Sequence, residues 1–443
     1  MEIRLSDHFT YSKLLKFVFP TIIMMIITSI YSIVDGFFVS NFVGKNAFAA
    51  VNLIMPALTG LVAFGFMIGT GGSALIGKTL GEGNQKRANQ YFTMLIYVTI
   101  VVGIILSILG FLFIRPISQM LGATSSIIEE CVIYGRTILF ATTFYMLQSC
   151  FQSFLVTAEK PKMGLIISII SGVMNVILDF LFVYVFQMGI FGAALATALS
   201  QCVGGIIPLI YFFKENTSLL HFVKTKFDFQ ALKKACFNGS SEMLTNLSAS
   251  LVGILYNYQL IRIAAENGVV AYGVIMYVNF VFMSLFFGYQ IGVSPIVSYH
   301  YGAQNTQELK NIFHKSIILI IITSLLMTIT SYILSLPLSQ LYVGYDIELI
   351  KMTTTGMKIY AFSFLICGFN IFGSAFFTAL NNGLISAIIS ILRTLVFQVL
   401  AILILPYLWG LNGVWFAIVV AEGLTFIVTV LFLFFNRKKY QYV

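Results

Sequence analysis

Three acidic residues lie inside long apolar stretches of the sequence: Asp35, Asp179 and Glu422. An ionised carboxylate at the middle of a membrane is costly unless it is paired, hydrated or protonated, so an intramembrane acid marks an ion or proton site. Almost all other acidic residues fall in polar segments or at the ends of apolar ones. The chemistry to expect at these three positions is reversible binding of a cation or a proton.

Two of these acids have polar neighbours that could share an ion. Tyr31 precedes Asp35 by one helical turn, and Asn175 lies four residues before Asp179 on the same helix face. Thr197, in the segment IFGAALATALSQ, adds a hydroxyl. Two adjoining carboxylates in a low dielectric cannot both stay ionised without a cation. The set therefore suits either a shared proton or a dehydrated Na⁺.

We accordingly predict an H⁺ or Na⁺ site at Asp35, Asn175, Asp179 and Thr197. Pro20 lies further back in the segment of Asp35, where a proline removes a backbone hydrogen bond and permits a helix to bend. The alternative interpretation of these residues is a satisfied polar contact between helices.

Two of the remaining charges in apolar segments, Glu422 and Glu242, have two interpretations each. Glu422 is either a second site for a proton or a substrate cation, or a hydrogen-bonding partner of a neighbouring helix. Glu242 lies near the beginning of its apolar segment, where it either contacts a substrate or favours a helix N-terminus. Arg393 is expected to extend its charged end to the membrane surface.

The composition is that of a membrane protein with many helical spans. Of 443 residues, 59% are apolar and only 9% are charged, and the mean hydropathy is +0.96. Because a soluble domain carries about 25% charged residues, a cytosolic globular enzyme is excluded. The net charge of +9 does not indicate nucleic-acid binding, since the basic residues gather at the ends of apolar segments.

A span needs about 20 helical residues. The apolar segments predict twelve spans, near residues 14–40, 49–76, 91–115, 131–156, 163–187, 191–213, 237–262, 271–297, 312–335, 353–379, 384–407 and 411–435. Of the Lys and Arg residues in the loops and near the ends of the spans, 18 fall on the side of the membrane that holds both termini and 6 fall on the other side. This bias predicts that both termini are cytoplasmic.

The chain is predicted to contain two lobes of six helices, residues 1–213 and 237–443, joined by a basic cytoplasmic linker at 214–236. Phe222, Phe227, Phe229 and Leu232 could hold this linker on the membrane surface. A shift of 221 residues aligns the lobes, matching Gly81 with Gly302, Pro116 with Pro337 and Gly189 with Gly410. The repeat predicts a pseudo-two-fold axis along the membrane normal and a central cavity, as in transporters with alternating access. An inert duplicated scaffold is the alternative.

The acidic set occurs in the first lobe only. The second-lobe counterparts of Asn175, Asp179 and Thr197 are Val396, Leu400 and Ile418, which favours a role in ion coupling over a role in packing. Candidates for the lining of the central cavity are Tyr145, Gln148, Glu242, Asn246, Tyr256, Met283 and Asn370. Aromatic and Met side chains suit varied lipophilic cations.

Several segments together resemble the multidrug and toxic compound extrusion (MATE) transporters. They are PTIIMMIITSIYSIVDGFFVSNFVG, GTGGSALIGKTLGEGN, AEKPKMGLIISIISGVMNVILDFLFV, FGAALATALSQ and its echo LNGVWFAIVVAEG. The chain length and the segment GSSEMLTN are most similar to the MepA-type bacterial branch. The resemblance implies two six-helix lobes that form a V, and efflux driven by inward movement of H⁺ or Na⁺.

The resemblance also implies a set of first-lobe residues around the coupling ion, namely Pro20, Tyr31, Asp35, Tyr134, Asn175, Asp179 and Thr197. One feature departs from the family pattern. Some relatives carry an acid in the tenth helix, where this chain has FLICGFNIFG, so a carboxylate site in that helix is doubtful.

The sequence therefore predicts a secondary active exporter of small lipophilic, often cationic drugs, acting as a monomer in a bacterial plasma membrane. No cofactor, ATP or nucleic acid is expected. A flippase for lipid-linked saccharides is the alternative, although it should carry several cavity arginines. A membrane enzyme would need a nucleophile–base or metal set, and all four histidines fall in loops or at helix ends. A pore is disfavoured by the one-sided acidic set.

Overall fold

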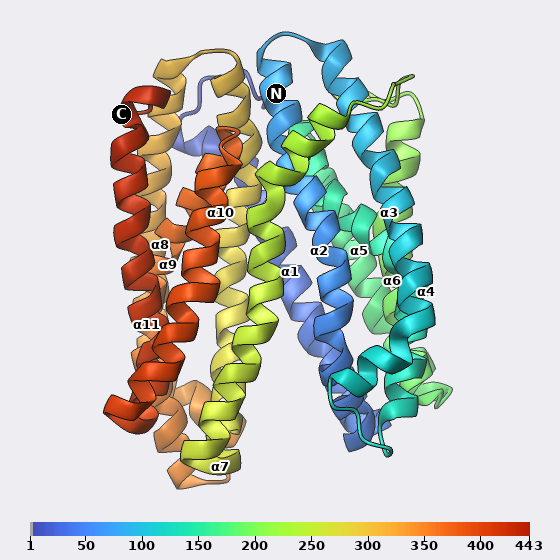
Figure 1. Ribbon diagram of the computed structural model, residues 1–443, viewed down its shortest axis with the longest axis vertical. Coiled ribbons are helices and arrows are strands. Elements are labelled where there is room, and N and C mark those ends of the chain that lie inside the picture. Colours follow the sequence, from blue (N-terminus) through green and yellow to red (C-terminus); the bar gives the residue numbers. More distant parts are fainter. Residues whose placement is uncertain (1–2) are drawn as a thin grey trace.

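The structure, a computed structural model, describes residues 3–443, and over these residues it contains helices and no strand (Figure 1). The first half of the chain forms α1 (Tyr11–Phe38), α2 (Lys45–Gly81), α3 (Gln85–Met120), α4 (Ile128–Thr157), α5 (Pro161–Asp179) and α6 (Gly189–Phe213). The second half forms α7 (Phe229–Gly302), α8 (Thr306–Val343), α9 (Ile347–Ala379), α10 (Gly383–Ile391) and α11 (Gln398–Tyr440). Short π-helical segments are η1 (Val39–Val43), η2 (Phe180–Val185) and η3 (Leu392–Phe397).

Two helices contain an internal kink that separates two membrane-spanning lengths. The kink in α7 lies at Ala265 (φ 50°, ψ −145°), and the kink in α11 lies at Gly410 (φ 56°, ψ −133°). Within residues 3–443, ten helical stretches are long and apolar enough to cross a membrane. Divided at the two kinks, they become the twelve predicted spans, so the predicted helical membrane fold is confirmed.

Left-handed backbone recurs in the two halves at the spacing of the sequence repeat. The pairs are Gly44 and Ala265 (φ 126° and 50°), Gly83 and Gln304 (77° and 55°), and Gly189 and Gly410 (61° and 56°). Ala265 adopts this conformation although a Cβ disfavours it. Positive φ angles therefore recur at the repeat spacing, although only the pair Gly189 and Gly410 keeps the same residue type.

The two halves meet at one end of the molecule and separate toward the other. Figure 1 shows α2 to α6 on one side and α8 to α11 on the other, with both termini at the end where the halves converge. There α2 and α7 touch backbone to backbone: a Cβ added to Gly71 would lie 1.9 Å from the carbonyl oxygen of Ala235, and one added to Gly302 would lie 2.0 Å from that of Lys78. Glycine is required for this closure.

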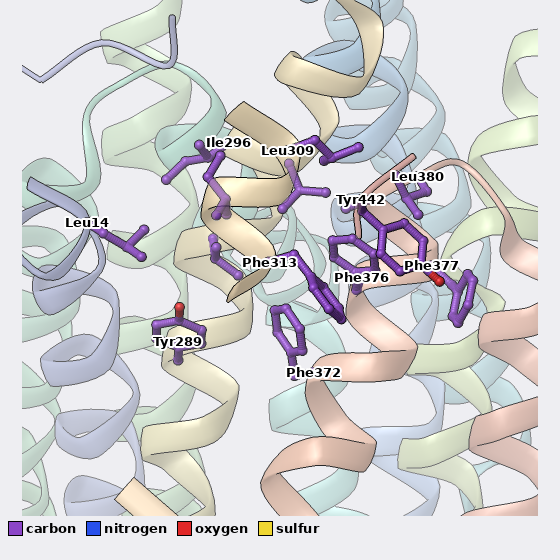
Figure 2. Close-up of a cluster of buried hydrophobic side chains, with 14 of the residues drawn as sticks. Leu14, Tyr289, Ile296, Leu309, Phe313, Phe372, Phe376, Phe377, Leu380 and Tyr442 are labelled. Carbon is purple, nitrogen blue, oxygen red and sulfur yellow. The ribbon is translucent and has the colours of Figure 1, made fainter. Parts of the chain in front are cut away.

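A buried aromatic cluster reinforces the same end. Phe313 and Phe376 pack with ring centroids 5.1 Å apart, and Tyr442 packs on Phe313 at 4.9 Å (Figure 2). Leu14 of α1 and Tyr289 of α7 belong to the same cluster (Figure 2). Side chains from α1, α7, α8, α9 and the C-terminus are thereby buried together.

The segment before α1 bridges elements of both halves. The backbone N–H of Leu5 donates to Oε1 of Glu159, in the turn after α4, over 2.5 Å. Four residues later, the N–H of Phe9 donates to Oε1 of Glu308 in α8 over 2.8 Å, and His8 lies 2.6 Å from Oε2 of the same carboxylate. Leu5 and Phe9 are fully buried, so this segment fastens the converging end.

The expected linker at 214–236 differs from the prediction in two respects. Non-helical chain ends at Asp228, whose side chain accepts from the N–H of Ala231 over 3.0 Å and caps α7, so that residues 229–236 are helical. Phe222 does not extend away from the protein, because it packs on Phe92 of α3 with ring centroids 5.2 Å apart. Leu232 also packs on a buried cluster of the first half. The backbone N–H groups of His221 and Val223 donate to side-chain oxygens of α3, Oδ1 of Asn89 over 3.2 Å and Oγ1 of Thr93 over 3.1 Å.

We expect Gly71→Ala to loosen the converging end of the molecule. The new Cβ would overlap main-chain atoms of α7, which cannot rotate away as a side chain can. Overpacking of this kind costs about 1–3 kcal/mol. Thermal unfolding of the purified variant should therefore begin at a lower temperature, and a disulfide cross-link between cysteines placed in α2 and α7 should form more slowly.

Gly423→Ala is the matched control, since a Cβ at this helical position meets nothing within 4 Å. It should leave both measurements unchanged or raise the unfolding temperature slightly. Equal behaviour of the two variants would contradict the proposed role of the α2–α7 contact.

Candidate functional site

Three of the predicted site residues meet between α1, α5 and α6. Oγ1 of Thr197 donates to Oδ1 of Asp35 over 3.2 Å. Asp179 lies near Asp35, and the two carboxyl groups interact. Two ionised carboxylates have no proton to donate, so this contact is favourable only when a proton or a cation lies between them.

Four atoms beside this contact have no partner. Asp179 is fully buried and Asn175 is 1% exposed. Both carboxylate oxygens of Asp179, and both the oxygen and the nitrogen of the Asn175 amide, lack a hydrogen bond to any residue of 3–443. An unpaired buried polar group is expensive, and native proteins rarely retain one without a reason. A proton shared by the carboxyls, or a cation held by the carboxyl and amide oxygens, would supply missing partners.

Asp35, Asn175, Asp179 and Thr197 form what we term the first-half polar cluster. The Tyr134 hydroxyl, from α4, interacts with Thr197 and with both carboxyl groups. The Tyr31 hydroxyl interacts with Asp35 and with Tyr145, which the sequence had assigned to the substrate cavity. Tyr31 and Tyr134 therefore lie near the cluster, and the Tyr134 hydroxyl donates to Sδ of Met55 over 3.9 Å.

Irregular helix follows both acids. Asp179 is the last residue of α5 and is followed at once by the π-helical η2, while η1 begins four residues after Asp35. Such segments interrupt the regular backbone pairing of a helix and are frequent at functional sites. Gly172 of α5 makes room for Tyr31, since a Cβ there would lie 3.0 Å from Cδ1 of the tyrosine ring.

Pro20 does not belong to this cluster. It lies fifteen residues before Asp35 on α1, which corresponds to about 22 Å of helix. Pro20 instead lines a cavity of about 700 Å³ with Glu159, Lys16 and Lys162 near the converging end. It can affect the cluster only through the shape of α1.

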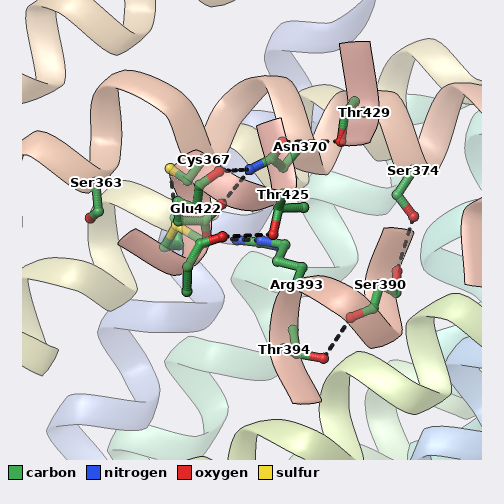
Figure 3. Close-up of polar contacts among 12 residues, drawn as sticks. Ser363, Cys367, Asn370, Ser374, Ser390, Arg393, Thr394, Glu422, Thr425 and Thr429 are labelled. Atoms are coloured by element: carbon green, nitrogen blue, oxygen red, sulfur yellow. Dashed lines mark hydrogen bonds and ion pairs between the residues drawn. The ribbon is translucent and has the colours of Figure 1, made fainter. Parts of the chain in front are cut away.

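The second half contains a buried polar network of a different kind (Figure 3). Nε of Arg393 donates to Oε1 of Glu422 over 2.8 Å, and Nδ2 of Asn370 donates to Oε2 of Glu422 over 2.7 Å. Thr429 in turn donates to the amide oxygen of Asn370 over 3.1 Å. The prediction that Arg393 extends to the membrane surface is wrong, because Arg393 is only 9% exposed and Glu422 neutralises it.

Glu242 lies where the two halves meet. Its Oε1 accepts from Nε2 of Gln290 over 2.9 Å. Both side chains line a cavity of about 20 Å³ together with the hydroxyl groups of Thr70, Ser73, Ser153, Ser294 and Thr378. The interpretation of Glu242 as a helix-start residue is wrong, since α7 begins thirteen residues earlier, at Phe229.

The other cavity candidates are distributed over separate environments. Gln148 packs beside Gly204 within the first half. Tyr256 stacks on Tyr272 with ring centroids 4.9 Å apart, and Met283 lies 3.8 Å from Cys367. Asn246 donates to the backbone of Glu242, and Asn370 belongs to the Glu422 network.

Sequence reasoning missed two partners, namely Arg393 for Glu422 and Gln290 for Glu242. The signal for the first was present, because Arg393 and Glu422 are opposite charges in consecutive apolar spans. Gln290 gave no comparable signal, since a neutral polar residue is common within transporter helices.

The comparisons with known proteins decide the family. The family model described as MatE matches residues 20–181 and 243–403, most of the chain, with one matched range in each half. The chain belongs to the MatE family.

Similar curated proteins and solved structures agree with this assignment. Multidrug export protein MepA of Staphylococcus haemolyticus is 24% identical over 418 residues, covering 93% of this chain and 90% of that protein. The Staphylococcus aureus protein of the same name is 22% identical, covering 97% and 94%. The crystal structure of MATE in complex with MaL6 superposes with a TM-score of 0.92 at 22% identity, covering 98% of each chain. An outward-facing multidrug resistance MATE family transporter gives 0.92 at 21%, also covering 98% of each chain.

In this MatE protein we expect Asn175→Leu to weaken ion binding without lowering the stability of the ion-free protein. The change removes two unpaired buried polar atoms, so the unfolding temperature in Na⁺-free buffer at neutral pH should not fall. An ion bound at 100 times its Kd stabilises the folded state by about 2.7 kcal/mol. The stabilisation that Na⁺ or mild acid gives the wild type should be absent from the variant.

Asn370→Leu is the control for this experiment. The Asn370 amide is fully hydrogen-bonded, so its loss should cost about 1–3 kcal/mol while leaving the stabilisation by the ion intact. An Asn175→Leu protein that still responds to Na⁺ or acid like the wild type would exclude Asn175 from the site.

Proposed function

We propose that this protein is a secondary active multidrug transporter that exports small lipophilic, often cationic compounds across a bacterial plasma membrane in exchange for H⁺ or Na⁺. The observation that carries the proposal is the first-half polar cluster, in which the carboxyl group of Asp179 and the amide of Asn175 retain four unpaired buried atoms near a second acid, Asp35. The relatives named as multidrug export proteins support the choice of substrate.

The coupling step follows from charge balance in the cluster. A proton or Na⁺ entering between Asp35 and Asp179 cancels one negative charge and lets the two carboxyls remain in contact. When the ion leaves, repulsion favours separation of α1 from α5. Pro20, which interrupts the hydrogen bonding of α1, offers a place where α1 can bend in response.

The proposed substrate path runs between the halves, where the Glu242 carboxylate faces hydroxyl groups of both. A carboxylate in a low-dielectric cleft attracts cations strongly. Tyr145, Gln148, Asn246, Tyr256, Met283 and Asn370 are proposed to contribute as the cavity opens. Drug binding and ion binding would then exclude each other, because both depend on how the two halves are arranged.

The proposal includes the arrangement of the chain in the membrane. Residues 1–213 and 237–443 are the two moving lobes, and the converging end, which holds both termini, faces the cytoplasm. The excess of Lys and Arg at this end supports that orientation. The proposed functional unit is a monomer, with a substrate path between its own two lobes. The central cavity would then open to the outside.

We expect Asp35→Asn to abolish export while leaving a folded, inserted protein. An amide cannot release a proton or hold a cation by charge, so the cycle would lose its reset step. Cells that express the variant should accumulate a fluorescent lipophilic cation to the level of cells without the protein, a loss of at least about tenfold in initial rate. Membrane yield and unfolding temperature should stay near the wild-type values.

Glu266→Gln is the control, because Glu266 is an exposed acid outside the cluster. It should export at the wild-type rate. Wild-type export by Asp35→Asn cells would remove Asp35 from the coupling site.

The coupling ion can be identified in liposomes. With a pH gradient and a Na⁺ gradient imposed separately, only one of them should drive uptake of the cation into vesicles that hold the wild-type protein. Neither gradient should drive uptake by Asp35→Asn. Equal uptake without any gradient would contradict secondary active transport.

A further inference from the structure

Positive charge and apolar surface meet in the cavity between α1 and α5. This cavity of about 700 Å³, which Pro20 also lines, lies near the converging end. Lys16 of α1 lines it, together with Lys160 and Lys162 at the start of α5. Because α1 and α5 are far apart in the sequence, the fold brings these lysines to one cavity, and no single basic run of the chain explains them.

Two of the lysines have no partner in the protein. Lys16 and Lys162 are exposed, and neither makes a hydrogen bond or ion pair with another of the described residues. Glu159 is the acid that lines the cavity, and its Oε1 already accepts from the N–H of Leu5. The ammonium groups of Lys16 and Lys162 are therefore available to a ligand with negative charge.

The walls of the cavity are mainly apolar. Leu15 and Phe19 of α1 line it, at 43% and 58% exposed, and Met163 of α5 lines it as well. Apolar side chains contribute to binding only when another apolar group covers them. A small inorganic anion would therefore use only the lysines, whereas a ligand with a charged end and an apolar end would contact the whole lining.

The outer face of α5 continues the apolar surface. Ile166, Ile169, Val173 and Ile177 follow Lys162 on one helix face, and each is between 39% and 55% exposed. The last three of them line a second hollow, of about 350 Å³. It lies about 10–22 Å along the helix from Lys162, and the hydrocarbon of one membrane leaflet is about 15 Å thick. An acyl chain whose headgroup lies at Lys162 would reach this hollow.

We propose that the cavity between α1 and α5 binds an anionic glycerophospholipid, with its phosphate at Lys16 and Lys162 and an acyl chain along the outer face of α5. A basic pocket between membrane helices suits such a headgroup. A zwitterionic headgroup fits less well, because it would bring an ammonium group beside two lysines that already lack a counter-charge. The proposal goes beyond transport and does not depend on the proposed substrate.

A role in membrane insertion alone does not explain the site. Lysines at helix ends orient a membrane protein wherever they lie, so they need not converge on one cavity. The helical plan does not require them either. At the repeat spacing of 221, Lys16 and Lys162 correspond to Phe237 and Gly383 in the second half.

A lipid in this cavity would join α1 to α5 close to Pro20. The two helices already pack there, since a Cβ added to Gly164 of α5 would lie 3.6 Å from Sδ of Met24 in α1. A phosphate between Lys16 and Lys162 would add a second connection on the side of α1 where Pro20 removes a backbone hydrogen bond. The bound lipid would therefore hold the start of α1 against α5.

The test measures which lipid touches the outer face of α5. The chain has two tryptophans, of which Trp415 is buried, so Trp409→Phe removes the one that lipid can reach. Ile169→Trp then introduces a tryptophan at the second hollow of the full-length protein. Vesicles contain phosphatidylcholine and phosphatidylglycerol in fixed proportion, and one lipid or the other carries bromine, which quenches tryptophan fluorescence on contact.

Brominated phosphatidylglycerol should quench the introduced tryptophan more strongly than brominated phosphatidylcholine, with a relative affinity of about tenfold. Ile104→Trp is the matched control, because Ile104 is also exposed and lines a hollow of about 550 Å³ between α3 and α4 that is apolar apart from Ser107 and Thr143. There the two lipids should quench equally.

Inorganic phosphate separates a lipid headgroup from a free anion. Added at constant ionic strength, it should not reduce the preference at the Ile169→Trp position, because it lacks an acyl chain. A preference that phosphate abolishes would assign the cavity to free phosphate and overturn the lipid site.

Variants of the lysines locate the charge that matters. Lys16→Gln with Lys162→Gln should remove the preference, while Lys16→Arg with Lys162→Arg should keep it, and exposed positions of this kind tolerate such changes. Lys224→Gln with Lys226→Gln removes the same amount of charge from a different cavity, beside α3. That variant should keep the preference.

Three results overturn the inference. They are equal quenching by the two lipids in Ile169→Trp, a preference that survives Lys16→Gln with Lys162→Gln, and a preference lost equally in Lys224→Gln with Lys226→Gln. The last would mean that the basic surface attracts anionic lipid without a site. None of them bears on the proposed export, which Asp35→Asn tests separately.

Discussion

A buried carboxylate must find a proton, a cation or a hydrogen-bond donor, and this requirement explains most of the polar architecture of the molecule. With 9% charged residues, the chain can place very few charges among its apolar helices, and each one recruits neighbours from helices distant in sequence. Asp35 draws Thr197 from α6, and Glu422 draws Arg393 and Asn370 from two other helices. Because these contacts cross between helices, they also specify which helices adjoin.

The packing at the converging end also affects the surroundings of a buried carboxylate. Glycines bring α2 and α7 into backbone contact, and the segment before α1 joins Glu159 to Glu308 across the two halves. Side chains of both halves are packed closely at this end. Glu242 lies in a small cavity lined by residues of both halves, where a charge interacts more strongly with its neighbours than it does in water.

The sequence predicted the helical spans well because hydropathy is a local property. It also singled out Asp35 and Thr197, which are hydrogen-bonded to each other, because the cost of burial draws attention to each acid separately. Its errors concern tertiary structure. Arg393 was assigned to the membrane surface because its partner lies 29 residues away on another helix. Glu242 was placed near a helix start because the cap at Asp228 was not recognised. Pro20 was grouped with residues about 22 Å away, since a family motif does not distinguish residues that touch an ion from residues that shape a helix.

The two halves share a backbone plan but differ in how their buried carboxyl groups are paired. Left-handed turns recur at the same spacing in both, yet the first half leaves both oxygens of Asp179 without a partner while the second gives both oxygens of Glu422 a fixed one. An unpaired carboxyl gains free energy from whatever cation reaches it, so its state depends on the surroundings. A carboxylate locked to a guanidinium keeps its state and imposes a constant field on the space nearby. Duplication of the helical lobe has thus left an unpaired buried carboxyl group in one half and a fully paired one in the other.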